Sequence, residues 1–125
     1  MNKIVEVIER EISHLDYLLI LHVKSLRDDK EWTQQELSKR MGAAISFVGN
    51  VENLNERHKY SIRHLAILYK VFGFNSMSKL FNFTPPTHDK VILKIKLTKS
   101  IDVNNKSRII KTELKEVILS DKFKL

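Results

Sequence analysis

The stretch "TQQELSKRMGAAISFVGNVEN", residues 33–53, decides the fold. Thr33 is a good N-cap residue, and Glu36 three positions later completes a capping box, so a short helix begins here. Gly42 ends that helix, where the chain needs a residue that tolerates a positive φ. A second short helix follows over "AISFVGNVEN", with Val48 and Val51 directed inward. The stretch therefore predicts two short helices joined by a tight glycine turn.

Two short helices joined in this way form a helix-turn-helix. The first helix has a small residue, Ser38, where the second helix crosses it closely, and Val48 fills the angle between the two. The second helix can then lie in a DNA major groove, roughly 12 Å wide, with its outward residues at the base edges.

Apolar residues at helical spacing extend on both sides of this motif. Between Ile4 and Leu26 they predict an amphipathic region that is either one helix or two helices broken near Ser13. After the motif, "SIRHLAILYKVF" predicts a helix capped by Ser61, and "SMSKLFNF" predicts one or two more helical turns. The chain up to residue 83 is thus expected to hold five helices.

The period changes after Pro85–Pro86. "VILKIKLTK" alternates as a strand does, and Asn104–Asn105 signals a turn. "RIIKTELKEVIL" either returns as an antiparallel strand or becomes helical from Thr112, so residues 112–119 are open between strand and helix. We favour a β-hairpin.

Composition narrows the function classes. The net charge of +7 divides into −2 for residues 1–32, +4 for 33–83 and +5 for 84–125. The positive charge favours a polyanionic partner, and the alternative is that the lysines only keep the protein soluble. There is no cysteine, no metal-ligand spacing among the histidines and no catalytic motif, so we expect no enzyme, cofactor or metal site. No apolar run approaches the roughly 20 residues of a membrane span, so we expect a soluble, cytoplasmic protein.

The segments "LRDDKEWTQQELSKRMGAAISFVGNVEN" and "YSIRHLAILYKVFGF" resemble the phage repressor/Cro (XRE-type) helix-turn-helix family over residues 15–80. The positions that match its pattern are Arg27, Thr33, Gln34, Leu37, Ser38, Gly42, Val48, Val51 and Glu52. The resemblance implies a mainly α fold, a five-helix repressor-like domain with a C-terminal β-hairpin extension. Its expected parts are a helical extension (1–16), the DNA-binding domain (17–83), a proline-containing linker (84–89) and the hairpin extension (90–125).

The resemblance also implies roles for individual residues. Gln34, Thr33 and Asn53 would contact the DNA backbone, and the loop residues Arg57, Lys59 and Tyr60 would follow the phosphates or reach the minor groove. The base-reading positions are Ile45, Ser46 and Asn50, with Phe47 beside them. Arg27 and Glu52 match an ion pair that ties the first helix to the end of the recognition helix.

Three features depart from the family pattern. Ala44 stands where a Ser or Thr usually caps the recognition helix, a loss worth about 0.5–2 kcal/mol. Gly49 lies within that helix and costs about 1 kcal/mol relative to Ala. The outward face has no Arg, Lys or Gln, and only Asn50 can make a bidentate contact with adenine. We therefore expect modest direct readout, supplemented by DNA shape.

The function expected from these observations is sequence-specific binding of double-stranded DNA by a transcriptional regulator of the repressor type, nucleoid-associated when bound. The resemblance implies a homodimer, with either the strand Val91–Lys99 or the amino-terminal helix around Ile4–Ile12 as the contact. The alternative is a protein–protein adaptor or antitoxin-like module that binds a protein partner through Ile45, Phe47 and the C-terminal extension.

Overall fold

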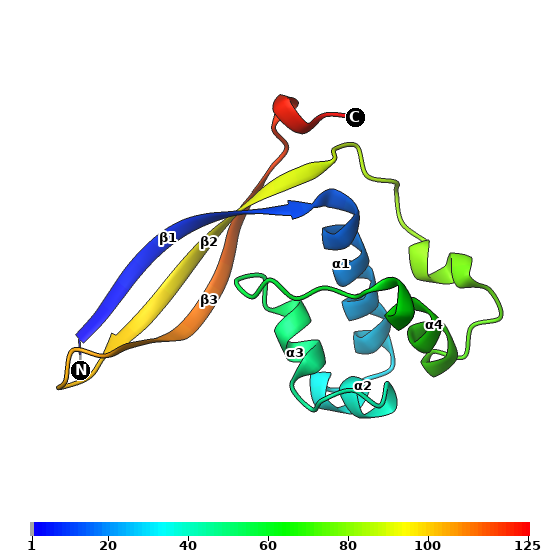
Figure 1. Cartoon of the computed structure of the whole chain (residues 1–125), viewed down its shortest axis with the longest axis horizontal. Helices are drawn as coiled ribbons and strands as arrows, with labels where there is room; N and C mark the ends of the chain where they lie inside the picture. The colour runs from blue at the N-terminus through cyan, green and yellow to red at the C-terminus, as the bar shows by residue number, and fades with distance from the viewer. Residues whose placement is uncertain (1) are drawn as a thin grey trace. The chain divides into compact units, whose positions relative to one another are not determined.

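A computed structural model describes residues 2–125 of the chain. Its elements, in order, are β1 (Asn2–Ser13), α1 (His14–Asp29), α2 (Gln34–Arg40), α3 (Phe47–Glu52), α4 (Ile62–Val71), the 3-10 helix η1 (Met77–Phe81), β2 (Lys90–Ile101), β3 (Ser107–Ile118) and the 3-10 helix η2 (Asp121–Phe123) (Figure 1). They form two compact units: a helical unit, His14–Pro86, and a sheet unit made of the described part of Met1–Ser13 with Thr87–Leu125.

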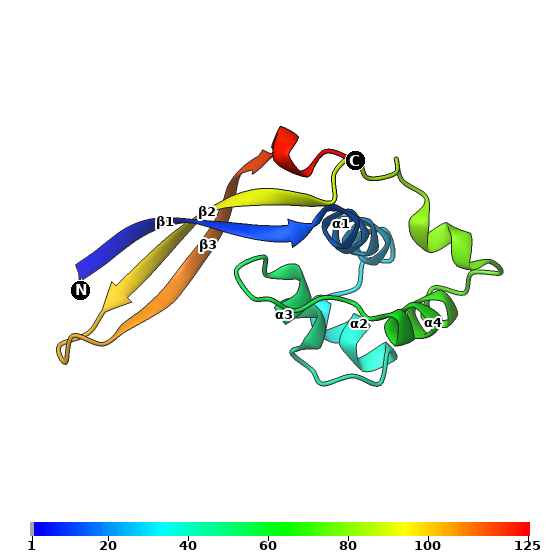
Figure 2. The ribbon, with the colours of Figure 1, turned by 45° about the horizontal axis from the view of Figure 1, so that its top comes forward.

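The helical unit contains all four α-helices and η1. Figure 2 shows α2, α3 and α4 together on one side of α1. Each element places at least one aliphatic side chain in the interior, and six of these are at most 1% exposed: Val23, Leu37, Val48, Val51, Leu68 and Leu80. Burial of aliphatic side chains is the main favourable contribution to folding, so these residues fix how the short helices pack.

The sheet unit is a three-stranded antiparallel sheet in the order β1-β2-β3. β2 is the central strand, and Val91, Leu93, Ile95 and Leu97 on one of its faces are at most 4% exposed. The turn after β2 is held by Asp102, whose Oδ1 accepts hydrogen bonds from the backbone N–H groups of Asn104 and Lys106. Asn105 has a positive φ of 59°, as the predicted turn requires.

The expectation of a mainly α, five-helix fold is wrong, because residues 2–125 form four α-helices and a three-stranded antiparallel sheet. The amino-terminal helical extension predicted for residues 1–16 is a strand over Asn2–Ser13, and α1 begins only at His14. Ile4, Ile8 and Ile12 are four residues apart, and this spacing places them on one face of a helix and also on one face of a strand. Pairing with β2 along the whole strand favours the second arrangement.

The fifth expected helix is the 3-10 helix η1, and residues 112–118 belong to β3. The register between β2 and β3 shifts twice, so that Ile110 and Lys115 each lack a partner directly opposite on β2. Such bulges interrupt the two-residue alternation of a strand. They explain why Leu114, Val117 and Ile118 have a spacing that also suits a helix.

This topology also corrects the expected dimer contacts. The strand Val91–Lys99 lies within β2, which has a hydrogen-bonded neighbour on each side and therefore no free edge. Residues 4–12 are not a helix.

Among residues 2–125, no helix is both long and apolar enough to cross a lipid bilayer.

Candidate nucleic-acid interface

The joint between α2 and α3 begins with the turn at Gly42. Thr33 is the N-cap of α2, and its Oγ1 accepts a hydrogen bond from the backbone N–H of Glu36 at 3.0 Å. At the other end, the N–H groups of Gly42 and Ala43 donate to the carbonyl oxygens of Lys39 and Ser38, the pattern of a Schellman motif. Gly42 has a φ of 68°, which confirms the prediction of a positive φ at this position.

The start of α3 differs from the expected one. The recognition helix was predicted to begin after Ala44, but α3 begins at Phe47, with Ser46 at the N-cap and no hydrogen bond from the Ser46 side chain to the helix. Ser38 of α2 supplies the missing cap, because its Oγ accepts a hydrogen bond from the buried N–H of Val48 at 3.0 Å. The same Oγ donates to the carbonyl oxygen of Gln34 at 3.0 Å. The small residue at the helix crossing therefore also caps α3.

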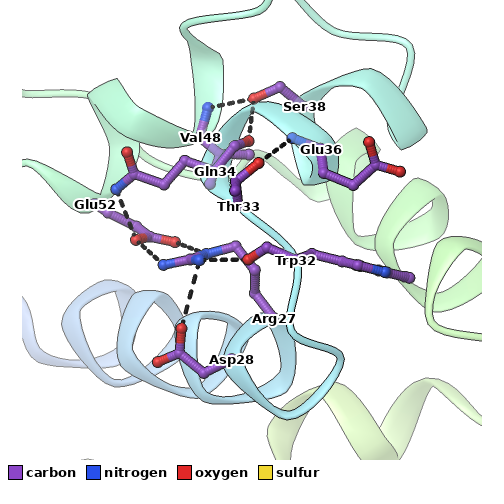
Figure 3. A network of polar contacts seen from close by, with 9 residues as sticks. All are labelled: Arg27, Asp28, Trp32, Thr33, Gln34, Glu36, Ser38, Val48 and Glu52. Carbon is purple, nitrogen blue, oxygen red and sulfur yellow. Dashed lines mark hydrogen bonds and ion pairs between the residues drawn. The ribbon is translucent and has the colours of Figure 1, made fainter.

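Arg27 of α1 and Glu52 of α3 form a bidentate ion pair (Figure 3). Arg27 Nε and Nη2 donate to the two oxygens of Glu52 at 2.9 and 2.8 Å, and the two side chains are only 10% and 4% exposed. Arg27 Nη1 also donates to the carbonyl oxygen of Trp32 at 2.7 Å. The hydrogen bond to Glu52 is the largest cause of the raised pKa of Arg27. The pair fixes the end of α3 against α1.

Gln34, the first residue of α2, lies against α3. Its Nε2 donates to Glu52 Oε1 at 3.0 Å, which adds a third donor to the buried carboxylate (Figure 3). A Cβ atom built on Gly49 would lie 3.2 Å from Gln34 Oε1, tighter than an ordinary contact. The absence of a side chain at Gly49 therefore leaves room for the amide of Gln34, which gives this departure from helix propensity a local reason.

The residues predicted to read bases lie where α3 begins and on its first turns. Ile45 is 59% exposed, Ser46 is exposed and Asn50 is half-buried. Val48 and Val51 on the opposite side of the helix are 0% and 1% exposed. The segment from Ile45 to Asn50 therefore has an inward apolar side and an accessible polar and apolar side.

Phe47 has a second role that the sequence did not suggest. Its ring is half-buried and packs against His64, with ring centroids 4.6 Å apart, and against Tyr60 at 5.9 Å. These two ring contacts hold the first turn of α3 against the loop before α4 and against α4 itself.

The residues predicted to contact the DNA backbone are mostly on the surface. Thr33, Gln34, Asn53, Arg57 and Lys59 are exposed. Four of them already have partners within the fold. Thr33 and Gln34 make the hydrogen bonds with Glu36 and Glu52 described above, Asn53 Oδ1 accepts from the backbone N–H of Asn55 at 3.1 Å, and Lys59 Nζ lies 3.6 Å from the carboxylate of Asp16.

Tyr60 is the exception among the predicted phosphate contacts. Its side chain is 4% exposed, and burial raises its pKa well above the ordinary value for tyrosine. The ring fills the space beside Phe47 and His64, so it belongs to the interior and cannot follow a phosphate backbone.

His64 helps to hold the start of α4 and packs against Phe47, a role that was not predicted from the sequence. The Ser61 hydroxyl accepts from the backbone N–H of His64, and His64 Nδ1 accepts from the N–H of Ser61 at 2.9 Å, so the two residues form a reciprocal capping box. Burial first and the charge of Arg63 second lower the pKa of His64. The signal was in the sequence, because a hydrogen-bonding side chain lies three residues after the Ser61 cap.

No protein-family model matches the chain, and no curated protein is significantly similar to it. Among solved structures, the chain is similar to a hypothetical transcription factor, NHTF, from Neisseria, with 23% identity and a TM-score of 0.46 over 53% of this chain and 72% of that one. At this level the similarity establishes neither a family nor a function.

Proposed function

We propose that the chain binds double-stranded DNA sequence-specifically through α2 and α3 and acts as a transcriptional regulator of the repressor/Cro type. The observation that carries this proposal is the two-sided character of the segment from Ile45 to Asn50. Its inward residues are fully buried, while Ile45, Ser46 and Asn50 remain accessible. A short, rigidly held helix with accessible residues on one side is what major-groove recognition needs.

The way α3 is held supports the proposal. Four contacts fix it at both ends: the Ser38 cap, the Arg27–Glu52 pair, the Gln34 amide on Glu52 and the Phe47–His64 packing. Residues that contact a ligand with defined geometry must themselves be held by their surroundings. In this proposal Asn50 reads adenine, Ile45 contacts a thymine methyl group, and Thr33, Gln34, Asn53, Arg57 and Lys59 contact the backbone. No catalytic role is assigned.

Selection of bound duplexes from a random pool tests the proposal directly. Enrichment of one defined sequence supports it, whereas a pool that stays random after several rounds contradicts it. A salt titration of the selected duplex adds a second readout, because contacts with phosphates release counterions and the affinity should fall steeply with salt.

One observation favours the alternative of a protein-binding module. Ile45 is 59% exposed, and no Arg, Lys or Gln occurs between residues 45 and 52, so this surface is less polar than a typical base-reading face. An adaptor or antitoxin-like module would bind its partner through Ile45 with little dependence on salt, since apolar contacts release few ions. The slope of affinity against salt therefore separates the two functions.

A further inference from the structure

The two edges of the sheet differ in how well they are protected against another strand. β3 carries two bulges, which interrupt its regular backbone and keep an edge from pairing. β1 has twelve residues, no proline and a continuous register with β2 from Asn2 to Ser13. Within residues 2–125, β1 pairs with β2 alone, so its outer edge is long, regular and unpaired.

The exposed side chains of β1 also indicate that another strand can pair with its outer edge. Ile4, Val5 and Val7 are 47%, 55% and 53% exposed, although β-branched residues of this kind usually lie against a neighbour. Ile4 lies on one face of the strand and Val5 and Val7 lie on the other, because successive side chains of a strand point to opposite faces. A strand added at the edge would cover part of both faces at once, which a partner on one face would not.

We propose that β1 pairs antiparallel with β1 of a second copy of this chain, about a two-fold axis at Ile8. Directly opposite residues in such a pair have position numbers that add up to 16. Ile8 then faces Ile8 of the second copy, Ile4 faces Ile12, and Glu6 faces Arg10. On this face of the strand apolar residues meet apolar ones and opposite charges meet, which is the pattern that stabilises a strand pair. On the other face Val7 lies opposite Glu9 and Val5 opposite Glu11.

Neighbouring registers match less well. An axis at Glu6 places the carboxylates of two Glu6 residues directly opposite each other, and an axis at Glu9 does the same for Glu9. Like charges in these positions are destabilising. An axis at Val7 places Ile8 opposite Glu6, Ile4 opposite Arg10 and Val5 opposite Glu9, so that apolar residues face charged ones on both faces of the strand. The register at Ile8 is therefore the one that the sequence of β1 selects.

The pairing of residues within the sheet also favours an axis at Ile8. In this chain Ile8 pairs with Ile95 of β2, and Ile95 pairs with Leu114 of β3. Figure 1 shows the three strands side by side along their length. An axis at Ile8 extends this apolar row across the interface, so that six strands share one continuous row. This inference does not depend on DNA binding.

The absence of cysteine makes the register measurable. Opposite residues of an antiparallel pair have Cα atoms about 4.5–5.5 Å apart, which suits a disulfide. After mild oxidation, Ile8→Cys should give a cross-linked dimer. Val7→Cys, whose side chain is more exposed but opposite Glu9 in this register, should give little. The unmodified chain should sediment as a dimer.

Each result of these experiments either supports or overturns the proposed strand pair. A monomer at all concentrations overturns the proposal, as does a dimer that cross-links through Val7→Cys or through neither position. If Ile8→Cys does not fold, a mixture of Ile4→Cys and Ile12→Cys chains replaces it. That mixture should give a cross-linked heterodimer, and a failure to do so alongside a cross-linkable control again counts against the register.

Discussion

The side chain of Ser38 caps α3 across the helix–helix joint, since its Oγ accepts a hydrogen bond from the buried backbone N–H of Val48 at 3.0 Å. The cap that a helix usually finds in its own sequence thus comes from α2. Neither α2, with seven residues, nor α3, with six, is long enough to be stable alone. The bond therefore makes the two helices depend on each other.

Ser38→Ala should lower the free energy of unfolding by about 1–3 kcal/mol, because it leaves the N–H of Val48 buried without an acceptor. Ser46→Ala is the matched control. It removes a hydroxyl from the N-cap residue itself, which is exposed and makes no capping bond to α3, and it should change stability by less than about 0.5 kcal/mol. Urea denaturation measures both. Equal losses for the two variants would contradict the role given to Ser38.

Glu52→Gln should destabilise the helical unit by about 3–5 kcal/mol, because the Arg27 guanidinium, 10% exposed, would lose its buried counter-charge. Asp28→Asn offers a close comparison. Asp28 Oδ1 lies 3.4 Å from Arg27 Nη1 but the side chain is 59% exposed, so its removal should cost at most about 1 kcal/mol. Thermal unfolding of both variants distinguishes the contributions. A small effect of Glu52→Gln would mean that the pair orients α3 without stabilising it.

The helix-turn-helix could be predicted from sequence because its signals are local. The Thr33 cap, the Gly42 turn and the inward Val48 and Val51 are all within twenty-one residues, and each has a direct physical meaning. The structure reproduces the cap, the turn and the burial of both valines.

The errors arose where distant residues decide the outcome. The spacing of Ile4, Ile8 and Ile12 suits both a helix and a strand, and the choice depends on their partners in β2, which lie 79 to 95 residues away in the chain. The resemblance implied that Tyr60 follows the phosphates, but packing against Phe47 buries it. The cap on Val48 comes from ten residues upstream, where no capping rule would look for it.

Stability should depend on pH through His64. Only the neutral imidazole can accept the N–H of Ser61, and the pKa of His64 is lowered in the folded chain. Below the unfolded value of 6.5 the unfolded chain then binds more protons than the folded one. The contribution is complete above that pH and is lost as the pH falls through the lower folded pKa.

His64→Gln is the informative variant, because glutamine at this position of a capping box can still accept the N–H of Ser61 but does not titrate. The unmodified chain should lose stability between pH 7.5 and pH 5.5 by more than His64→Gln does. His58→Gln, at an exposed position, should behave as the unmodified chain. Denaturant midpoints at the two pH values provide the test, and parallel losses in all three chains would exclude His64 as the titrating group.

Asn50 and Arg57 should affect DNA binding in different ways. Asn50 is half-buried on α3, and in the proposed function it contacts a base. Asn50→Ala should cost about 1–3 kcal/mol on the selected duplex and relax the preference at one base pair. Arg57 is exposed in the loop after α3, and Arg57→Ala should weaken binding to every duplex alike and reduce the salt slope by about 1. Competition against single-base variants of the selected duplex, at two salt concentrations, measures both effects. If Asn50→Ala weakens all duplexes equally, Asn50 does not read a base, and recognition would have to depend on DNA shape or on Ile45 and Ser46.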